Sequence, residues 1–345
     1  MAKKAKRVKQ KLAISPAVVW AVVIVILAGV GYYASKSIEG SKAFTITNPI
    51  NTVYVADTGF DTNLGATEGA PVRTLRKAAS LVNASTGLVR QISIIPNNTA
   101  YKVADSDLGT PIEFSRDGAT TITGKQMLMV TLEKSKPQAK MIFNNKKGVL
   151  NIKQLSWWEF PLLISGEGST TTNISNLNFY VSNSSGMQEG LVVSNLSQGA
   201  SMSIENNQFR LEKRPAQSSF AAIGLFLTNV QTGSTLNVLR NNFVFTKGYS
   251  DGQGRLVGMQ MMNGGSDQTI FNGNIFATIG GNKQNNGLLA NQHNIGIWAE
   301  TYVDRLTVSA NKFGNFDGID IVEFAGKGRD QRIEFLSNSW WGVWS

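Results

Sequence analysis

The sequence predicts an all-β protein, a parallel β-solenoid, preceded by a single N-terminal transmembrane α-helix. Two repeated signals predict the solenoid. An Asn-x-aromatic unit recurs five times in the second half of the chain, and a glycine followed by alternating apolar residues recurs five times in step with it. Two interleaved signals with a common period indicate stacked coils. An uncharged apolar run near the start predicts the membrane helix.

Composition excludes several classes of site. The chain has 345 residues, of which 42% are hydrophobic and 16% charged, so it can bury a large core. It has no cysteine. Disulfides, thiolate metal sites and a cysteine nucleophile are therefore excluded.

The positive charge is concentrated at the start of the chain. Residues 1–39 carry seven Lys and Arg residues and one acidic residue, Glu39. Their net charge of +6 makes up most of the +10 of the whole chain. Residues 1–12 read as a basic tail on the inner side of a membrane, where it meets acidic lipid head groups or packaged nucleic acid. The rest of the chain is only weakly basic, so we expect no sequence-specific nucleic-acid binding.

An apolar segment follows the tail. The eighteen residues 17–34 carry no charge, and Trp20, Tyr32 and Tyr33 stand near its ends. At about 1.5 Å per residue this run approaches the thickness of a bilayer core. We expect residues 13–35 to be a single-pass helix with its N-terminus inside, joined by a linker at 36–50 to a domain outside. A cleaved signal peptide is the alternative, although Tyr32 does not suit a cleavage site after Ala34.

The same segment, KLAISPAVVWAVVIVILAGVGYY, resembles the start of archaeal type IV pilins. Those proteins have a basic leader, a small residue at the cut, a Ser-Pro and a long apolar helix. The departure is Leu12, which stands where a basic residue is usual. The resemblance implies a filament subunit as one possible role.

Residues 51–345 are expected to form the solenoid. Tyr54 and Val55 read as a strand, and a turn-rich loop follows. A capping helix is expected at about 72–83, because four apolar residues lie there at helical spacing: Leu75, Ala78, Ala79 and Val82. QISIIPNNTAY then reads as a buried strand that ends at Pro96.

This opening resembles right-handed parallel β-helix proteins of the pectate-lyase-like superfamily. The matching positions are Tyr54-Val55, Gly59, Asp61, Asn63, Gly65 with Thr67, Pro71, Thr74-Leu75 and Ala78, and the departure is an extra residue, Ala66. The resemblance covers about fifty residues and implies a right-handed parallel β-helix. It does not imply one activity, because enzymes, adhesins and phage spikes share the fold.

The repeated asparagines are expected to form a structural ladder: Asn207, Asn241, Asn274, Asn311 and Asn338. Asparagine tolerates the left-handed backbone of a tight turn, and its amide can bond to the coils above and below. The aromatic residue two positions later should point inward and stack on its equivalents: Phe209, Phe243, Phe276, Phe313 and Trp340.

The glycine-led units predict two further columns. Alternation places one column inside the solenoid: Leu191, Leu225, Met259, Ile297 and Ile319. The next residue of each unit faces outward: Val192, Phe226, Gln260, Trp298 and Asp320. We expect a sugar-stacking platform on this outer face, built from Phe226, Gln260, Trp298, Glu300 and Asp320. The alternative is that a loop or a neighbouring subunit covers the face.

The stretch NFDGIDI, residues 315–321, raises the question of catalysis. It resembles a motif of the polygalacturonase branch, in which Asp317 would be one catalytic carboxylate. Asp317 and Asp320 are the catalytic candidates, but no paired aspartates, Gly-His-Gly or Arg-x-Lys follow them. Glycoside hydrolysis needs two carboxylates at a defined separation, and a lyase would need calcium and a base. The sequence leaves open whether the chain is an enzyme, and it favours a non-catalytic role. No cofactor is expected, except calcium if the chain is a lyase.

The functional hypothesis is a membrane-anchored, non-catalytic surface or spike-like protein for adhesion, glycan recognition or assembly. Its partners would be the bilayer, a surface polysaccharide, and further copies of itself in a homo-oligomer or larger assembly. It would stand on a cell or virion surface. The alternatives are an anchored polysaccharide lyase or glycoside hydrolase, and a structural subunit of a pilus-like filament or lipid-containing virion.

Overall fold

The computed structural model describes most of the chain from residue 51 onward. The described residues are 51–85, 89–96, 100–132, 139–182, 188–212, 221–246, 256–264, 268–279, 295–300, 305–314, 322–325 and 332–341. The expected tail 1–12, membrane helix 13–35 and linker 36–50 lie outside them. Among the described residues, no helix is long and apolar enough to cross a membrane.

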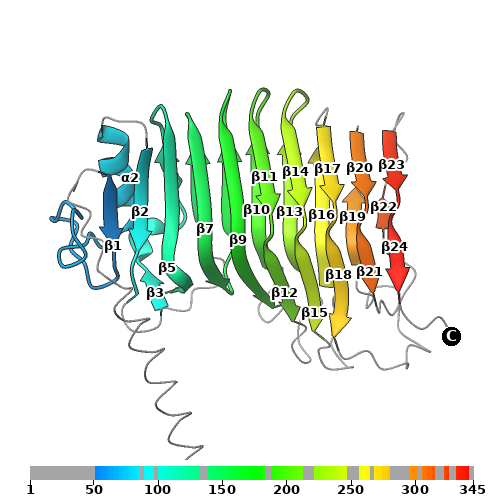
Figure 1. Ribbon diagram of the computed structural model, residues 1–345, viewed down its shortest axis with the longest axis horizontal. Helices are drawn as coiled ribbons and strands as arrows, with labels where there is room; N and C mark the ends of the chain where they lie inside the picture. The colour runs from blue at the N-terminus through cyan, green and yellow to red at the C-terminus, as the bar shows by residue number, and fades with distance from the viewer. Residues whose placement is uncertain are drawn as a thin grey trace, which may run out of the picture. The chain divides into compact units, whose positions relative to one another are not determined.

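The described part of the chain is an all-β parallel solenoid, as the sequence predicts (Figure 1). Its strands form a sheet of 16 strands and a sheet of 8 strands. The larger sheet contains β1 (Thr52–Val55), β2 (Val89–Ile94), β3 (Ala100–Val103), β5 (Ala119–Leu132), β7 (Val149–Trp158), β9 (Thr171–Ser182), β11 (Ser201–Glu205), β12 (Gln208–Glu212), β14 (Thr235–Leu239), β15 (Asn242–Thr246), β17 (Gln268–Asn272), β18 (Ile275–Ile279), β20 (Arg305–Ser309), β21 (Lys312–Gly314), β23 (Arg332–Leu336) and β24 (Ser339–Trp341). The smaller sheet contains β4 (Ile112–Phe114), β6 (Met141–Asn145), β8 (Leu162–Gly166), β10 (Gln188–Leu196), β13 (Ala222–Val230), β16 (Leu256–Gly264), β19 (Ile295–Glu300) and β22 (Val322–Ala325).

The larger sheet divides into two limbs at strand β9. The first part of β9 pairs in parallel with β11, and its second part pairs in parallel with β12. The upper limb continues through β11, β14, β17, β20 and β23, and the lower limb through β12, β15, β18, β21 and β24. Figure 1 shows the two limbs one above the other along the solenoid. Each later coil therefore crosses a corner between its two short strands.

The corner contains one left-handed residue in each coil. These residues are Asn206 (φ 55°), Arg240 (φ 53°), Gly273 (φ 66°), Ala310 (φ 51°) and Ser337 (φ 55°). Each of them comes one position before a ladder asparagine. The expectation that the ladder asparagines themselves adopt this backbone was therefore wrong. The preceding residue turns the chain, which leaves the asparagine side chain free to bond along the solenoid axis.

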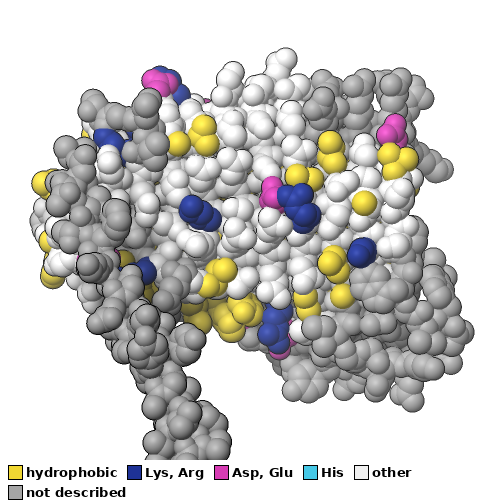
Figure 2. Space-filling model, in the orientation of Figure 1, with side chains coloured by type: hydrophobic (Ala, Val, Ile, Leu, Met, Phe, Trp, Pro, Cys, Tyr) yellow, Lys and Arg dark blue, Asp and Glu magenta, His cyan; other side chains and the backbone are white. Residues whose placement is uncertain are grey.

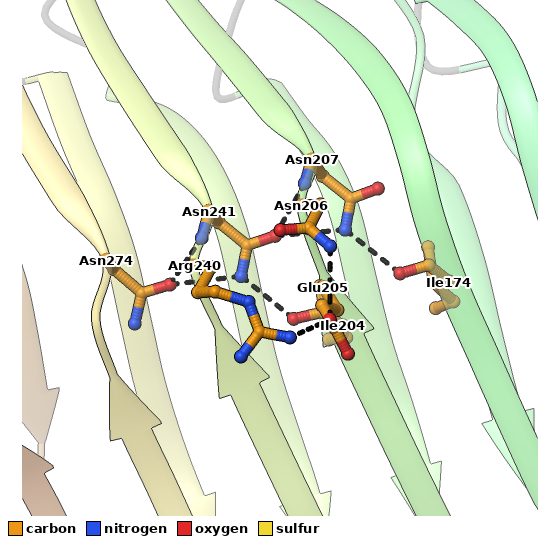
Figure 3. A network of polar contacts seen from close by, with 8 residues as sticks. All are labelled: Ile174, Ile204, Glu205, Asn206, Asn207, Arg240, Asn241 and Asn274. Carbon is orange, nitrogen blue, oxygen red and sulfur yellow. Dashed lines mark hydrogen bonds and ion pairs between the residues drawn. The ribbon is translucent and has the colours of Figure 1, made fainter.

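The five asparagines are linked one to the next through their amides. Figure 3 shows the first three of them, Asn207, Asn241 and Asn274. Asn207 shows the pattern: its backbone N–H and its Nδ2 both donate to Oδ1 of Asn241, at 2.9 and 3.0 Å. The Nδ2 of Asn207 also donates to the carbonyl of Ile174 in the coil before it, at 3.0 Å. Asn241, Asn274 and Asn311 repeat this arrangement. The ladder gives hydrogen bonds to backbone N–H and C=O groups that the corner removes from the strand pairing. These groups are buried, so they need such partners.

The phenylalanines of the repeat form one buried column behind the ladder. Phe209, Phe243, Phe276 and Phe313 are at most 2% exposed. Successive rings are stacked, with centroids 4.6 to 4.9 Å apart and interplanar angles of 5 to 7°. Phe179 extends the column by one ring toward the N-terminus, at 4.9 Å. At the other end Trp340 is the register partner of Phe313. Parallel strands about 4.8 Å apart bring like rings into contact, and each such pair adds about 0.5–1.5 kcal/mol to the burial of the rings.

The repeat glycines pack against this column. A Cβ atom on Gly258 would lie 2.6 Å from the carbonyl oxygen of Gly296 and 2.9 Å from the ring of Phe276. Gly190 and Gly224 are equally crowded by the next glycine carbonyl, at 2.8 Å. These three glycines are therefore required by close approach between the smaller sheet and the stacked rings.

Helix α2 (Leu75–Ala84) lies beside β1 and β2 at the N-terminal end of the solenoid (Figure 1). Its apolar face is buried on that end, as the helical spacing of its residues predicts. Two carboxylates hold its first turn. Asp61 accepts hydrogen bonds from the backbone N–H groups of Arg73 and Thr74, and Asp107 accepts from those of Leu75 and Arg76.

These contacts give a structural role to the opening motif. Asp61 also accepts a 2.8 Å bond from the Thr74 hydroxyl, and Asn63 donates to the Pro71 carbonyl at 2.9 Å. Asp107 lies in the 3-10 helix η1 (Asp105–Asp107) and is fully buried, and this burial raises the pKa of its carboxyl group. The motif residues therefore serve to attach the cap.

Candidate functional site

The predicted outward column on the smaller sheet is present through four coils. Val192 pairs with Phe226, Phe226 with Gln260, and Gln260 with Trp298. The matching inward column is also as predicted, because Leu191, Leu225, Met259 and Ile297 are at most 1% exposed.

The outward side chains of Val192 and Gln260 are buried, whereas those of Phe226 and Trp298 are partly exposed. Gln260 is only 4% exposed. Phe226 and Trp298 pack against a second apolar cluster, separate from the core, made by the residue before each repeat glycine: Ile223, Val257 and Ile295. These three are at most 1% exposed. Phe226 and Trp298 therefore offer only part of their surface to solvent, and glycan binding by the column stays a prediction. The alternating pattern of the sequence did not predict that the residues before the repeat glycines form this second apolar cluster.

The fifth position of the column was assigned wrongly. Strand β22 pairs Val322 with Ile297 and Glu323 with Trp298. The partner of Trp298 is thus Glu323 and not Asp320, and Val322 takes the place predicted for Ile319. Both stretches alternate apolar residues, so the period of two fits either register, and Gly318 favoured the wrong one.

The catalytic candidates Asp317 and Asp320 lie outside the described residues, and a catalytic role for them stays a prediction. Glu300 ends β19, and its Cα partner is Ala325. Within the described ranges no group of three His, Asp or Glu side chains is placed to hold a metal ion.

A different surface is open, on the long strands before the repeat becomes regular. The sequence LSWWEF places its two tryptophans on opposite faces of β7. Trp157 is 1% exposed in the core, whereas Trp158 is 38% exposed on the outside. The ring of Trp158 packs on that of Tyr180 in β9, with centroids 4.5 Å apart and planes inclined by 32°. The backbone fixes this pair, because the N–H of Glu159 donates to the Tyr180 carbonyl at 3.0 Å.

Exposed methionines and polar groups lie on the strands to either side of the aromatic pair, and Met129 is the register partner of Ser156, two residues before Trp158. Met127 and Met129 on the adjacent strand β5 are 46% and 36% exposed. On the other side, Arg210 of β12 is the register partner of Tyr180 and is exposed. Figure 2 shows hydrophobic side chains gathered over the lower ends of β5, β7 and β9, with a basic and an acidic side chain beside them. We call this surface the Trp158 patch: Met127, Met129, Trp158, Tyr180 and Arg210.

The exposed polar side chains at the Trp158 patch can form hydrogen bonds with a ligand. Gln208 and Glu212 flank Arg210 on the same outer face, and all three are exposed. Among the described residues, neither Arg210 nor Glu212 makes an ion pair. Asn178 lies two residues before Tyr180 and donates to the hydroxyl of Ser156, at 3.3 Å. The patch therefore combines a rigid aromatic surface with amide, guanidinium and carboxylate groups, a set that binds by stacking and hydrogen bonding.

Comparison of the chain with protein-family models, with curated proteins and with solved structures gives no match.

Proposed function

We propose that the chain is a membrane-anchored, right-handed parallel β-helix that recognises glycans outside the membrane without catalysis, as an adhesion or spike-like surface protein. The anchor is residues 13–35, and the glycan site is the Trp158 patch. The observation that carries the proposal is the exposed Trp158 ring, packed on Tyr180, in the outer face of a regular sheet.

Exposure of the Trp158 ring to water is unfavourable. A tryptophan that is 38% exposed keeps a large apolar surface in water, beside two methionines that are similarly exposed. Isolated exposed apolar residues are common, but a contiguous group rimmed by polar residues is typical of a binding surface. Sugar rings have C–H faces that pack against aromatic rings and hydroxyl edges that bond to amides and charged groups. The patch offers both kinds of contact.

The arrangement of the patch also suits an extended ligand. Its residues come from four successive strands along the solenoid, β5, β7, β9 and β12. Neighbouring strands are about 4.8 Å apart, so the surface repeats its contacts along the axis. A polymer of sugar units can follow such a row without a deep pocket.

The test measures glycan binding by the full-length chain in detergent, on an array of neutral and acidic polysaccharides. We expect Trp158→Ala and Tyr180→Ala each to weaken binding on the order of tenfold, equivalent to about 1.4 kcal/mol. Ile275→Ala is the matched control, because Ile275 is 37% exposed on the lower limb but is not aromatic. Equal binding by Trp158→Ala and Ile275→Ala, or binding of no glycan at all, would refute the proposal.

A further inference from the structure

A row of outward side chains crosses the Trp158 patch and has an exposed cation at each end. The row follows the strand pairing from β3 to β12, and its members are Lys102, Thr131, Trp158, Tyr180 and Arg210. Thr131 lies level with Trp158, because the residues before them are register partners. The order along the solenoid is therefore a cation, a hydroxyl group, two aromatic rings and a second cation.

Trp158 lies midway between the two cations. Each cation is two strands away from it, and neighbouring strands are about 4.8 Å apart, so the backbones of Lys102 and Arg210 are about 19 Å from each other. Both side chains are exposed. Within the described ranges, neither of them makes an ion pair. Each can therefore pair with an anionic group of a ligand that lies along the solenoid on the two rings.

The acidic side chains near the row lie on one side of it. Glu159 accepts a hydrogen bond from the Ser182 hydroxyl at 3.3 Å, and Ser182 is the register partner of Glu212, two residues beyond Arg210. On the other side a second outward row runs parallel to the first and contains no charged residue: Ala100, Met129, Ser156, Asn178 and Gln208. An anionic ligand is therefore favoured on this second side, where the two amides can bond to hydroxyl groups.

We propose that the glycan bound at the Trp158 patch is an acidic polysaccharide, with one anionic group at Lys102, another at Arg210, and the sugar rings between them packed on Trp158 and Tyr180. This inference rests on the proposed glycan binding and adds the class of glycan. A neutral polymer leaves both cations without an anionic partner, so the two charges select the acidic polymer. Because the ion pairs form at an exposed surface, each contributes modestly, and salt weakens it.

The experiment compares polymers that differ only in charge. Full-length chain in detergent is titrated with hyaluronan, alginate and polygalacturonate, with the methyl ester of each, and with the neutral polymers dextran and glucomannan. We expect an acidic polymer to bind at least about tenfold more tightly than its ester at low ionic strength, with a smaller difference at high salt. Circular dichroism checks the folding of every variant.

Substitutions then test the two cations. Lys102→Gln and Arg210→Gln should each weaken binding of the acidic polymer about fivefold and leave binding of its ester unchanged. Glu212→Gln removes the negative charge beside Arg210 and should strengthen binding of the acidic polymer. Lys153→Gln is the matched control, because Lys153 is exposed on β7 but lies in the part of that strand that aligns with the upper limb. It should change neither affinity.

Three outcomes would overturn this inference and leave the proposed function intact, provided that Trp158→Ala still weakens glycan binding. The first is equal or tighter binding of the ester or of a neutral polymer. The second is unchanged binding of the acidic polymer by both cation variants. The third is tighter binding of single-stranded DNA, which would assign the rings and cations to stacked bases and phosphates. Binding of no polysaccharide at all would overturn the proposed function, and this inference with it.

Discussion

Replacing Asn241 by alanine removes four hydrogen bonds from the middle of the ladder. Oδ1 of Asn241 accepts from the backbone N–H and from Nδ2 of Asn207, at 2.9 and 3.0 Å. Its Nδ2 donates to the carbonyl of Ile204 at 2.8 Å and to Oδ1 of Asn274 at 3.0 Å. The side chain is fully buried, so water does not replace these contacts. The substitution therefore leaves the Asn207 N–H group buried and unpaired.

The magnitude follows from these partners. A buried donor without a partner costs about 1–3 kcal/mol, and each further lost bond about 0.5–1.5 kcal/mol. Because Nδ2 of Asn207 keeps its bond to Ile174, the losses do not add fully. We expect Asn241→Ala to lower the free energy of unfolding by about 3–5 kcal/mol.

The assay is urea denaturation of the full-length chain, followed by far-ultraviolet circular dichroism. Asn237→Ala is the matched control, because Asn237 lies in the same coil but faces outward from β14 and is partly exposed. We expect it to change stability by no more than about 0.5 kcal/mol. A loss below about 1 kcal/mol for Asn241→Ala, or equal effects of the two substitutions, would refute the reasoning that the ladder stabilises the corner.

Three further predictions test other parts of the scaffold. Gly258→Ala should lower the free energy of unfolding by more than about 3 kcal/mol, because its Cβ would clash with backbone and with a stacked ring. Gly69→Ala should be nearly neutral in the same denaturation assay, since nothing lies within 4 Å of its Cβ. Equal effects of the two substitutions would contradict the packing argument. Ala310→Gly should stabilise the fold and Gly273→Ala should destabilise it, each by about 1 kcal/mol, because both positions have positive φ. Melting temperatures that move in the opposite directions would count against backbone strain at the corner. Burial raises the pKa of Asp107 in the folded state, so its contribution to stability is full below the pKa of the unfolded chain, near 4, and is lost as pH rises through the folded pKa. The melting temperature of the wild type relative to that of Asp107→Asn should therefore fall over that pH range. A difference that does not change with pH would be the contrary result.

The repeating features of the fold could be predicted from the sequence because they repeat. Asparagine and phenylalanine recur at a common period, and in a parallel solenoid equivalent positions lie directly over one another. This constraint alone puts Phe209 against Phe243, and Asn207 against Asn241. Helix α2 was also predictable, because its apolar spacing is local.

The tertiary structure decided which outer surface is open and which register the last coil adopts. Alternation of side chains has a period of two and says only that a residue points outward. Whether an outward residue is then buried, as Gln260 is at 4% exposure, depends on tertiary packing that alternation does not specify. For the same reason the pattern fitted both Asp320 and Glu323 beside Trp298, and only the strand pairing chose Glu323. The exposed Trp158 ring had no repeat to mark it, so the sequence by itself could not separate it from its buried neighbour Trp157.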